Sequence, residues 1–235
     1  MSGTLFGVGV GPGDPELLTL KAHRLINQAL VIAYPAPDSG DSFARTIVAE
    51  LIPEQAREIP IIVPMQVDRF PAQEVYDQAS AEVAAELDGG HDVVVLCEGD
   101  PFFYGSFMYL YERLADRYPI EIVPGVTSMT ACAAVLSRPL AARNDVISVI
   151  PAPLPEAELK SRIEAADAAA IIKVGRHFQK VRRVLDDLGL TDASGYVERA
   201  TLDNQKISRL SDLDADAAPY FSMILVYKGS EAWIS

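Results

Sequence analysis

The sequence predicts an α/β fold with two domains and mainly parallel sheets. Short apolar, β-branched runs alternate along the chain with helical patterns, which is typical of βαβ units. Glycine-containing loops follow three of the apolar runs, where open α/β sheets usually bind their ligands. The chain has 235 residues, 49% of them hydrophobic, and can therefore bury one large core or two modest ones.

Nine strands are expected from the apolar runs, at residues 5–10, 30–34, 59–63, 93–96, 120–123, 146–150, 170–174, 196–197 and 220–227. Seven helices are expected between them, at residues 16–28, 42–51, 73–87, 106–117, 128–136, 156–166 and 178–188. A break at residues 116–119 ends a helix and opens a strand, so we expect domains at 1–117 and 118–235. The last strand is expected to pair antiparallel at a sheet edge.

Composition narrows the class of protein. The net charge of −13 argues against nucleic acid as a partner. No run reaches the roughly 18–20 apolar residues of a membrane span, and the N-terminus lacks a secretory pattern. A cytoplasmic protein without membrane partners is therefore expected. Cys97 and Cys132 are expected to be reduced thiols in the core.

The acidity is unevenly distributed. Between Arg138 and Arg209 there are twelve Lys/Arg against ten Asp/Glu, whereas the remaining sequence has eight against 23. Such a cationic section is consistent with binding of an anionic ligand. Some of these cations fit solvated helix faces better, namely Lys160, Arg162, Lys180, Arg182 and Arg183.

The first glycine loop, residues 7–15, follows the first strand and leads into a helix. A dinucleotide fingerprint starting at Gly7 would need a third glycine where Pro12 stands, and no P-loop lysine follows. Pro12 and Pro15 also remove N–H donors that a phosphate would use. The loop therefore suits a ligand without phosphates, such as S-adenosylmethionine (SAM), or it is only a tight turn.

Two further loops follow the strands at 93–96 and 120–123. Residues 98–106 read EGDPFFYGS and residues 124–129 read PGVTSM. Asp100, Thr127 and Ser128 can cap the helices that follow, which is the structural alternative to ligand binding.

The three loops together, GxGPGDPELLT, EGDPFFYGS and PGVTS, resemble the tetrapyrrole methyltransferase family of SAM-dependent enzymes. The resemblance covers essentially the whole chain and includes the segments at 172–177, 198–205 and 219–223. Two of these segments, 173–177 and 198–201, most resemble members that methylate carbon 20 of precorrin-2 to give precorrin-3A in cobalamin synthesis. The same reaction on cobalt-factor II, and methylation of another corrin or uroporphyrinogen carbon, remain alternatives.

The resemblance implies the class III, tetrapyrrole methylase type of fold, a homodimer, and SAM held between the two α/β domains. By position, it implies SAM contacts from Pro12, Gly99, Asp100, Pro101, Gly105, Thr127, Ser128, Val174, Ala200, Tyr220, Phe221 and Ser222. Many relatives have an apolar residue where this chain has Lys173, so the role of that side chain stays open.

Methyl transfer from SAM is an in-line displacement that depends mainly on alignment of the reacting atoms. A proton is then lost, for which a general base is useful. Asp100, Tyr104 and His177 are the candidates for this base, and for Asp100 helix capping or SAM binding is the better interpretation.

Precorrin-2 carries eight carboxylates, which an acidic protein would repel without local cations. We expect two or three of five side chains to bind them: Arg138, Arg143, Arg176, His177 and Arg199. The alternative for each is an ordinary ion pair, for example between Arg199 and Glu198. His23 and His91 have no metal-ligand spacing to His177, so no metal is expected.

The aromatic run that includes Phe102, Phe103, Tyr104, Phe107, Tyr109 and Tyr111 is expected to be mainly core, with its first members forming one wall of a macrocycle trough. A nicotinamide oxidoreductase and a non-catalytic SAM or tetrapyrrole carrier are the other classes that remain open, as is a diphthine synthase on the same fold.

Overall fold

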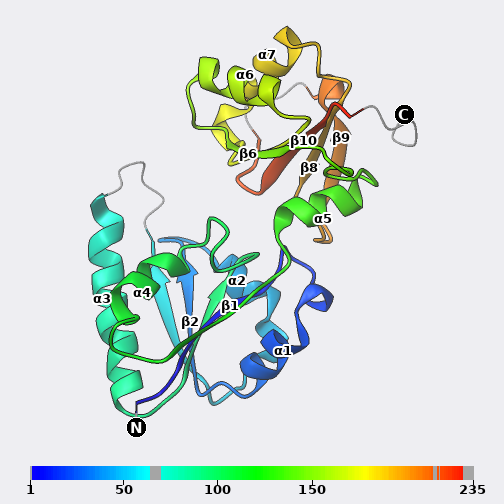
Figure 1. The fold of residues 1–235 in the computed structure, drawn as a ribbon. Coiled ribbons are helices and arrows are strands. Elements are labelled where there is room, and N and C mark those ends of the chain that lie inside the picture. Colours follow the sequence, from blue (N-terminus) through cyan, green and yellow to red (C-terminus); the bar gives the residue numbers. More distant parts are fainter. Residues whose placement is uncertain (1, 64–69, 214–215, 217, 230–235) are drawn as a thin grey trace. The chain divides into compact units, whose positions relative to one another are not determined.

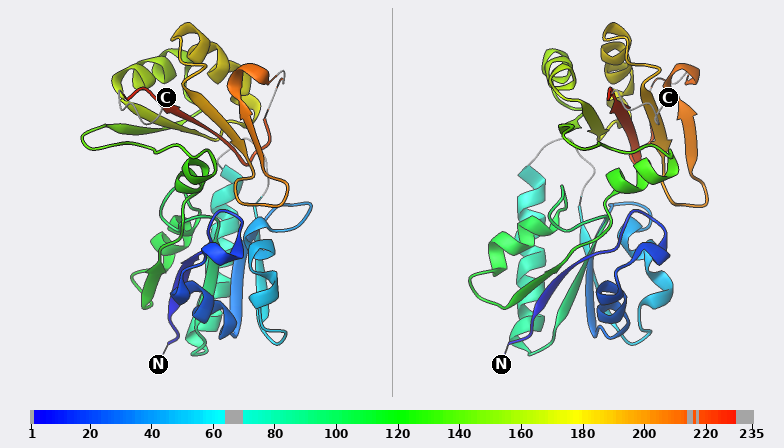
Figure 2. Two further views of the ribbon diagram at one scale, coloured as in Figure 1. Left: turned by 90° about the vertical axis from the view of Figure 1, so that its right-hand side faces the viewer. Right: turned by 45° about the vertical axis from the view of Figure 1, so that its right-hand side comes forward.

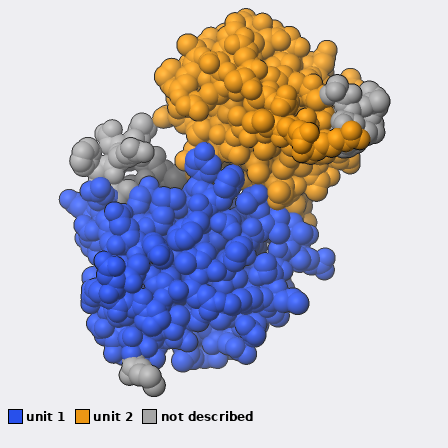
Figure 3. Space-filling model, in the orientation of Figure 1, with its two compact units in different colours: residues 1–127 blue, residues 128–235 orange. Residues whose placement is uncertain are grey.

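The computed structural model describes residues 2–63, 70–213, 216 and 218–229. The chain divides into two compact units, Met1–Thr127 and Ser128–Ser235, each built around a five-stranded sheet (Figure 1, Figure 3). The division lies after residue 127, and not after residue 117 as the sequence suggested. The physical reason is that strand β5 (Ile120–Val123) pairs with β1 in the first sheet.

The first sheet has the order β3-β2-β4-β1-β5, and all its neighbouring strands are parallel. Its other strands are β1 (Leu5–Gly9), β2 (Val31–Ala36), β3 (Arg57–Ile62) and β4 (Val93–Cys97). The two central strands β1 and β4 are apolar almost throughout because helices cover both faces of the sheet.

Helices α1 (Leu20–Asn27) and α2 (Phe43–Ile47) cover one face, and α3 (Phe70–Asp88) and α4 (Phe107–Leu114) cover the other (Figure 2). Successive side chains of β4 alternate between these two cores, so Val94 and Leu96 face α1 and α2 while Val93 and Val95 face α3 and α4. The helix expected at 16–28 is interrupted before Thr19, whose hydroxyl caps α1 by accepting the Ala22 N–H at 3.1 Å.

The order of the strands creates a switch point between β1 and β4. The chain leaves β1 through α1 towards β2, whereas it leaves the neighbouring β4 through α4 towards β5, on the other side of β1. The two connections run over opposite faces of the sheet. Such a divergence opens a crevice at the carboxyl ends of the two strands, which is the usual ligand position in open α/β sheets.

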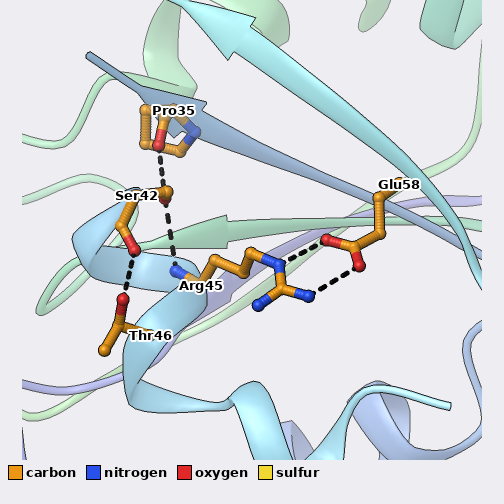
Figure 4. A network of polar contacts seen from close by, with 5 residues as sticks. All are labelled: Pro35, Ser42, Arg45, Thr46 and Glu58. Atoms are coloured by element: carbon orange, nitrogen blue, oxygen red, sulfur yellow. Dashed lines mark hydrogen bonds and ion pairs between the residues drawn. The ribbon is translucent and has the colours of Figure 1, made fainter. Parts of the chain in front are cut away.

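A polar network fixes α2 to this sheet (Figure 4). The Ser42 hydroxyl donates to the Pro35 carbonyl at 2.5 Å and accepts the Arg45 N–H at 3.3 Å. The Arg45 guanidinium donates two bonds, of 2.6 and 2.8 Å, to the Glu58 carboxylate on β3. Those hydrogen bonds hold the pKa of Glu58 below its usual value. The network lies along β2 and β3 and plays a structural role.

The second sheet is mixed, with the order β6-β7-β10-β8-β9. Its strands are β6 (Ile147–Pro151), β7 (Ala168–Ile172), β8 (Ser194–Glu198), β9 (Lys206–Arg209) and β10 (Ser222–Tyr227). Only β6 and β7 are parallel among its described pairs. The last strand is antiparallel as predicted, but it lies in the middle of the sheet and not at an edge. Strand β9 was not predicted.

Helices α6 (Glu156–Ala165) and α7 (Phe178–Asp187) pack on one face of this sheet, and α5 (Ser128–Val135) packs on the other. Because β7 and β8 are both antiparallel to β10, they are parallel to each other. Their carboxyl ends therefore lie at the same edge of the sheet as the start of β10. We call this the carboxyl edge of the second sheet.

Cys97 and Cys132 are both buried and free, as expected for core thiols. Burial raises the pKa of the Cys132 thiol to about 12. No helix within the described part of the chain has the length and apolar character needed to cross a bilayer.

Candidate functional site

Three loops of the first unit meet at the carboxyl ends of β1, β4 and β5. The Gly99 N–H donates to the Gly11 carbonyl at 2.8 Å, and the Gly11 N–H donates to the Gly99 carbonyl at 3.3 Å. Both residues have positive φ, +78° at Gly11 and +63° at Gly99, which glycine adopts without strain. The first and second loops are thus joined through their backbones at the switch point between β1 and β4.

The third loop joins them at Gly125. A Cβ on Gly125 would lie 2.0 Å from the Gly99 carbonyl oxygen and 2.9 Å from the Gly9 Cα. A Cβ on Gly9 would lie 2.6 Å from the same Gly99 oxygen. These are contacts of backbone with backbone, so no side-chain movement can relieve them. The glycines of the motifs are therefore required for loop-to-loop contact, whatever ligand the loops hold.

Asp100 connects the second loop to the third. One oxygen of its carboxylate, Oδ1, accepts the N–H groups of Phe102 (2.9 Å) and Phe103 (3.2 Å), and the other, Oδ2, accepts the Gly125 N–H at 3.1 Å. Asp100 therefore caps the turn that contains Phe102 and Phe103, and not helix α4, which begins at Phe107. Its carboxylate also ties two loops together. A carboxylate held by three backbone donors is poorly suited to act as a general base.

The other first-unit residues expected to contact SAM lie on the same loops. Pro12 is buried in the first loop, and the following Asp14 accepts the Glu16 N–H at 2.8 Å. A Cβ on Gly105 would lie 2.4 Å from the Pro101 carbonyl oxygen, so the second loop closes on itself there. Thr127 ends the first unit, and Ser128 begins α5.

The expected SAM-contacting residues of the second unit lie at the carboxyl edge of its sheet. Three non-glycine residues there have positive φ: Lys173 (57°), Arg199 (47°) and Thr201 (70°). Such backbone costs energy and is concentrated at functional sites in proteins. The neighbours of these residues, Val174 and Ala200, are buried.

The same edge carries two exposed aromatic rings. Tyr220 and Phe221 are 63% and 38% exposed, and their ring centroids are 5.0 Å apart. The Phe221 carbonyl accepts the Arg199 N–H at 2.8 Å, and the Ser222 hydroxyl donates to the Pro219 carbonyl at 2.7 Å. The segment before β10 is thereby fixed to the strained turn after β8.

The five cations expected to bind substrate fall into two groups. Arg176, His177 and Arg199 follow β7 and β8 at the carboxyl edge. Arg138 instead donates to the carbonyl of Ala193, which precedes β8, at 3.0 Å, and Arg143 precedes β6. Two or three of the five were expected to bind carboxylates, and Arg138 and Arg143 lie apart from the other three, at the amino ends of these strands.

The remaining two arginines differ in their partners. Arg199 makes a 3.4 Å ion pair with Glu198, whose carboxylate also accepts the Tyr196 hydroxyl at 2.8 Å. The ion-pair alternative thus occurs at Arg199. Arg176 is exposed, and within the described part of the chain its Nε donates only to Nε2 of His177, at 3.5 Å. Arg176 is therefore the cation best placed to bind an external carboxylate.

The imidazole of His177 binds a proton less readily than an ordinary imidazole does. Burial lowers the pKa of its imidazole, and the nearby charges of Lys180 and Arg176 lower it further. We expect its titration midpoint in an NMR experiment to fall below the ordinary 6.5, with His177→Asn identifying the resonance. The pKa of His177 is lower in the native protein than in the unfolded chain. Its contribution to the free energy of unfolding is therefore present above the unfolded-state pKa and is lost as the pH falls through the native-state pKa. A midpoint above 6.5 would restore His177 as a cationic anchor.

The aromatic run on and before α4 is mostly at the surface and not in the core. Phe107 is buried, at 1% exposure, and its ring occupies the space in which a Cβ on Gly7 would lie. Phe102, Tyr104, Tyr109 and Tyr111 are all between 38% and 48% exposed. The core expectation is therefore wrong for Tyr109 and Tyr111, whereas Phe102 and Tyr104 are first members of the run, which were expected at a trough wall. An aromatic surface lies beside the second loop.

Glu98 is a candidate that the sequence reasoning missed. It follows β4 directly, and burial raises the pKa of its half-buried carboxyl. The sequence could have identified Glu98 by its place in the chain, between the end of a buried strand and Gly99, the glycine that pairs with the first loop. Among the described residues, no group of three or more His, Cys, Asp or Glu side chains could hold a metal ion.

The charge of the three loops fits SAM. Residues 7–15, 98–106 and 124–129 contain no Lys, Arg or His, and they include three acidic residues, Asp14, Glu98 and Asp100. Such an environment disfavours phosphate and favours a cation such as a sulfonium.

Comparisons with known proteins agree with this chemistry. The family model described as Tetrapyrrole (Corrin/Porphyrin) Methylases matches residues 4–214. The chain is 43% identical to the precorrin-2 C(20)-methyltransferase of Sinorhizobium sp, over 95% of each chain. It is 32% identical to the cobalt-precorrin-2 C(20)-methyltransferase of Salmonella typhimurium, over 97% of this chain and 98% of that one.

A solved structure leads to the same family. The uroporphyrin-III C-methyl transferase of Thermus thermophilus, complexed with S-adenyl homocysteine, superposes with a TM-score of 0.70 at 25% identity, covering 95% of this chain and 97% of that one. The resemblance inferred from the three loops is confirmed: the chain belongs to the tetrapyrrole (corrin/porphyrin) methylase family.

Proposed function

We propose that the protein is a SAM-dependent C-methyltransferase that adds a methyl group to carbon 20 of precorrin-2, giving precorrin-3A. The observation that carries the proposal is the phosphate-excluding loop cluster at the β1–β4 switch point, in a chain 43% identical to a precorrin-2 C(20)-methyltransferase. The relative named for the cobalt-containing substrate is less similar, at 32%. We therefore favour the metal-free substrate.

SAM supplies an activated methyl group with a good leaving group, so the protein's contribution is mainly alignment. In this proposal the backbone of the three joined loops holds one part of SAM, and Val174, Ala200 and the 220–222 segment hold the rest. The strained turns at Lys173, Arg199 and Thr201 present backbone groups that a relaxed strand end would not present. Arg176 binds carboxylate arms of the substrate, and so do the N–H groups of Arg199 that do not contact Glu198.

Mass spectrometry of an anaerobic incubation tests the activity. The protein is mixed with SAM and either precorrin-2 or cobalt-factor II, and the position of the methyl group is found by NMR with labelled methyl. We expect one added methyl at carbon 20 of precorrin-2. Methylation of cobalt-factor II alone would keep the enzyme class and reverse the choice of substrate. The absence of methylation on both would refute the proposed function.

Substitution of the arginines tests how the substrate is bound. Arg176→Ala is expected to raise the dissociation constant of the tetrapyrrole by about tenfold to a hundredfold, because a charge-assisted hydrogen bond is worth roughly 1.5–3 kcal/mol. The affinity for S-adenosylhomocysteine should not change. Arg143→Ala is the matched control, since Arg143 lies at the opposite edge of the same sheet. Equal losses in the two variants would show that only net charge matters.

We also propose that the protein acts as a homodimer in the cytoplasm, as the family resemblance implies. Light scattering on the purified protein measures the mass directly, and a monomeric mass would refute the proposed assembly.

A further inference from the structure

Glu98 occupies the switch point of the first sheet. The carbonyl of the preceding residue, Cys97, accepts the Val10 N–H at 2.9 Å, and the following residue, Gly99, is bonded to Gly11 in both directions. The backbone on both sides of Glu98 is therefore pinned to the continuation of β1. The Cα of Glu98 therefore has a defined position, at the end of the sheet where ligands bind in folds of this type.

The two carboxylates of the second loop have opposite environments. Asp100 accepts three backbone N–H groups and is fully used in holding the loops. The Glu98 carboxylate accepts a hydrogen bond from its own backbone N–H, and among the described residues no other hydrogen bond or ion pair is found for it. Paired carboxyl groups with contrasting surroundings commonly divide into a structural or charge-stabilising group and a proton-transfer group.

The surroundings of Glu98 keep its proton affinity high. Burial raises the pKa of Cys97 and of Tyr76, and the charge of Glu98 raises each of them further, so Glu98 lies near both side chains. These two side chains belong to the core beneath α3 and α4. The carboxyl is therefore beside apolar core and half-removed from water, and burial raises its pKa. No Lys, Arg or His occurs in the three loops to counteract this.

We propose that the Glu98 carboxylate takes the proton that the meso carbon loses after methyl transfer, an inference that rests on the proposed function. The carbon–carbon bond forms as the sulfur–methyl bond breaks, and that electron pair stays on sulfur. The carbon–hydrogen bond at carbon 20 then breaks, and its electron pair returns to the conjugated macrocycle. The proton goes to a carboxylate oxygen of Glu98, which releases it to water after the product leaves.

The test compares Glu98→Gln and Glu98→Asp with wild-type protein, using precorrin-2 with hydrogen or deuterium at carbon 20. Glu98→Gln should lower kcat about a hundredfold, the scale of lost general-base catalysis. It should also show a primary deuterium isotope effect that the wild type lacks, because proton removal becomes rate-limiting. Its affinity for S-adenosylhomocysteine, measured by calorimetry, should stay in the wild-type range. Glu98→Asp should recover part of kcat and move the acid limb of the pH profile to lower pH.

Three further variants separate the alternatives. Glu112→Gln removes an exposed carboxylate on α4 and should behave as wild type. His177→Asn and Tyr104→Phe test the other base candidates, and an isotope effect in either one, but not in Glu98→Gln, would overturn the proposal. A Glu98→Gln protein with wild-type kcat would overturn it as well.

If Glu98→Gln does not fold, the Glu98→Asp pH profile decides. An unmoved acid limb would refute the role of Glu98. Wild-type protein that methylates neither precorrin-2 nor cobalt-factor II would refute the proposed function instead, so the two failures are distinguishable.

Discussion

Gly125→Ala should abolish measurable binding of S-adenosylhomocysteine and destabilise the protein by about 3 kcal/mol, the upper range for overpacking a tight site. The added methyl would lie 2.0 Å from the Gly99 carbonyl oxygen, so the second and third loops must separate. That movement breaks the hydrogen bond from the Gly125 N–H to Asp100, which holds the third loop against the second. Calorimetric titration and chemical unfolding measure the two effects.

Gly89→Ala is the control for the substitution itself. Gly89 lies in the turn after α3, at the opposite end of the first sheet, and a Cβ there would approach no atom closer than 3.2 Å. This variant should bind S-adenosylhomocysteine normally. If Gly125→Ala bound it equally well, the three-loop contact would not be the SAM site.

The first unit was largely predictable from the sequence. Fully buried parallel strands produce continuous apolar runs, and β1 and β4 are of this kind. The loops after them contain Gly and Asp, and each of these residue types has only a few structural and chemical roles in such loops. The contacts between loops were not predictable, because nothing local indicates that Gly9, Gly99 and Gly125 meet at a single carbonyl oxygen.

The second unit was harder to predict, for identifiable reasons. Strand β9 is short and lies at an edge, with Lys206 and Ile207 both exposed, so burial leaves no pattern in its sequence. The order of the sheet decides which cations lie together, and the sequence contained no signal that β10 inserts between β7 and β8. Arg138 and Arg143 were therefore grouped with Arg176 and Arg199, from which the strand directions separate them.

Positive φ at Lys173, Arg199 and Thr201 was also hidden from the sequence. Non-glycine residues adopt such backbone only where the surrounding structure imposes it. The family motifs pointed to the segments that contain these residues, but they did not indicate that the backbone there has positive φ.

Asp100→Ala should lower the free energy of unfolding by about 3 kcal/mol, because three backbone N–H groups lose a charged acceptor at once. Thr19→Ala removes the side-chain acceptor of the Ala22 N–H at the start of α1 and should cost only about 1 kcal/mol, the typical value for a cap. Urea unfolding of both variants beside wild type gives the comparison. Equal losses would mean that the link from Asp100 to Gly125 contributes nothing.

Asp100→Asn separates the cap from the link between loops. An asparagine can keep its oxygen towards Phe102 and Phe103, but its NH₂ group would then face the Gly125 N–H, donor against donor. We therefore expect Asp100→Asn to lose less stability than Asp100→Ala. Both variants should lose affinity for S-adenosylhomocysteine to a similar extent. Stability and affinity would then respond to different oxygens of one carboxylate: Oδ1 holds the second loop in shape, and Oδ2 holds the third loop against it. A variant that kept full affinity would place the binding determinant elsewhere on the loops and leave Asp100 with the cap alone.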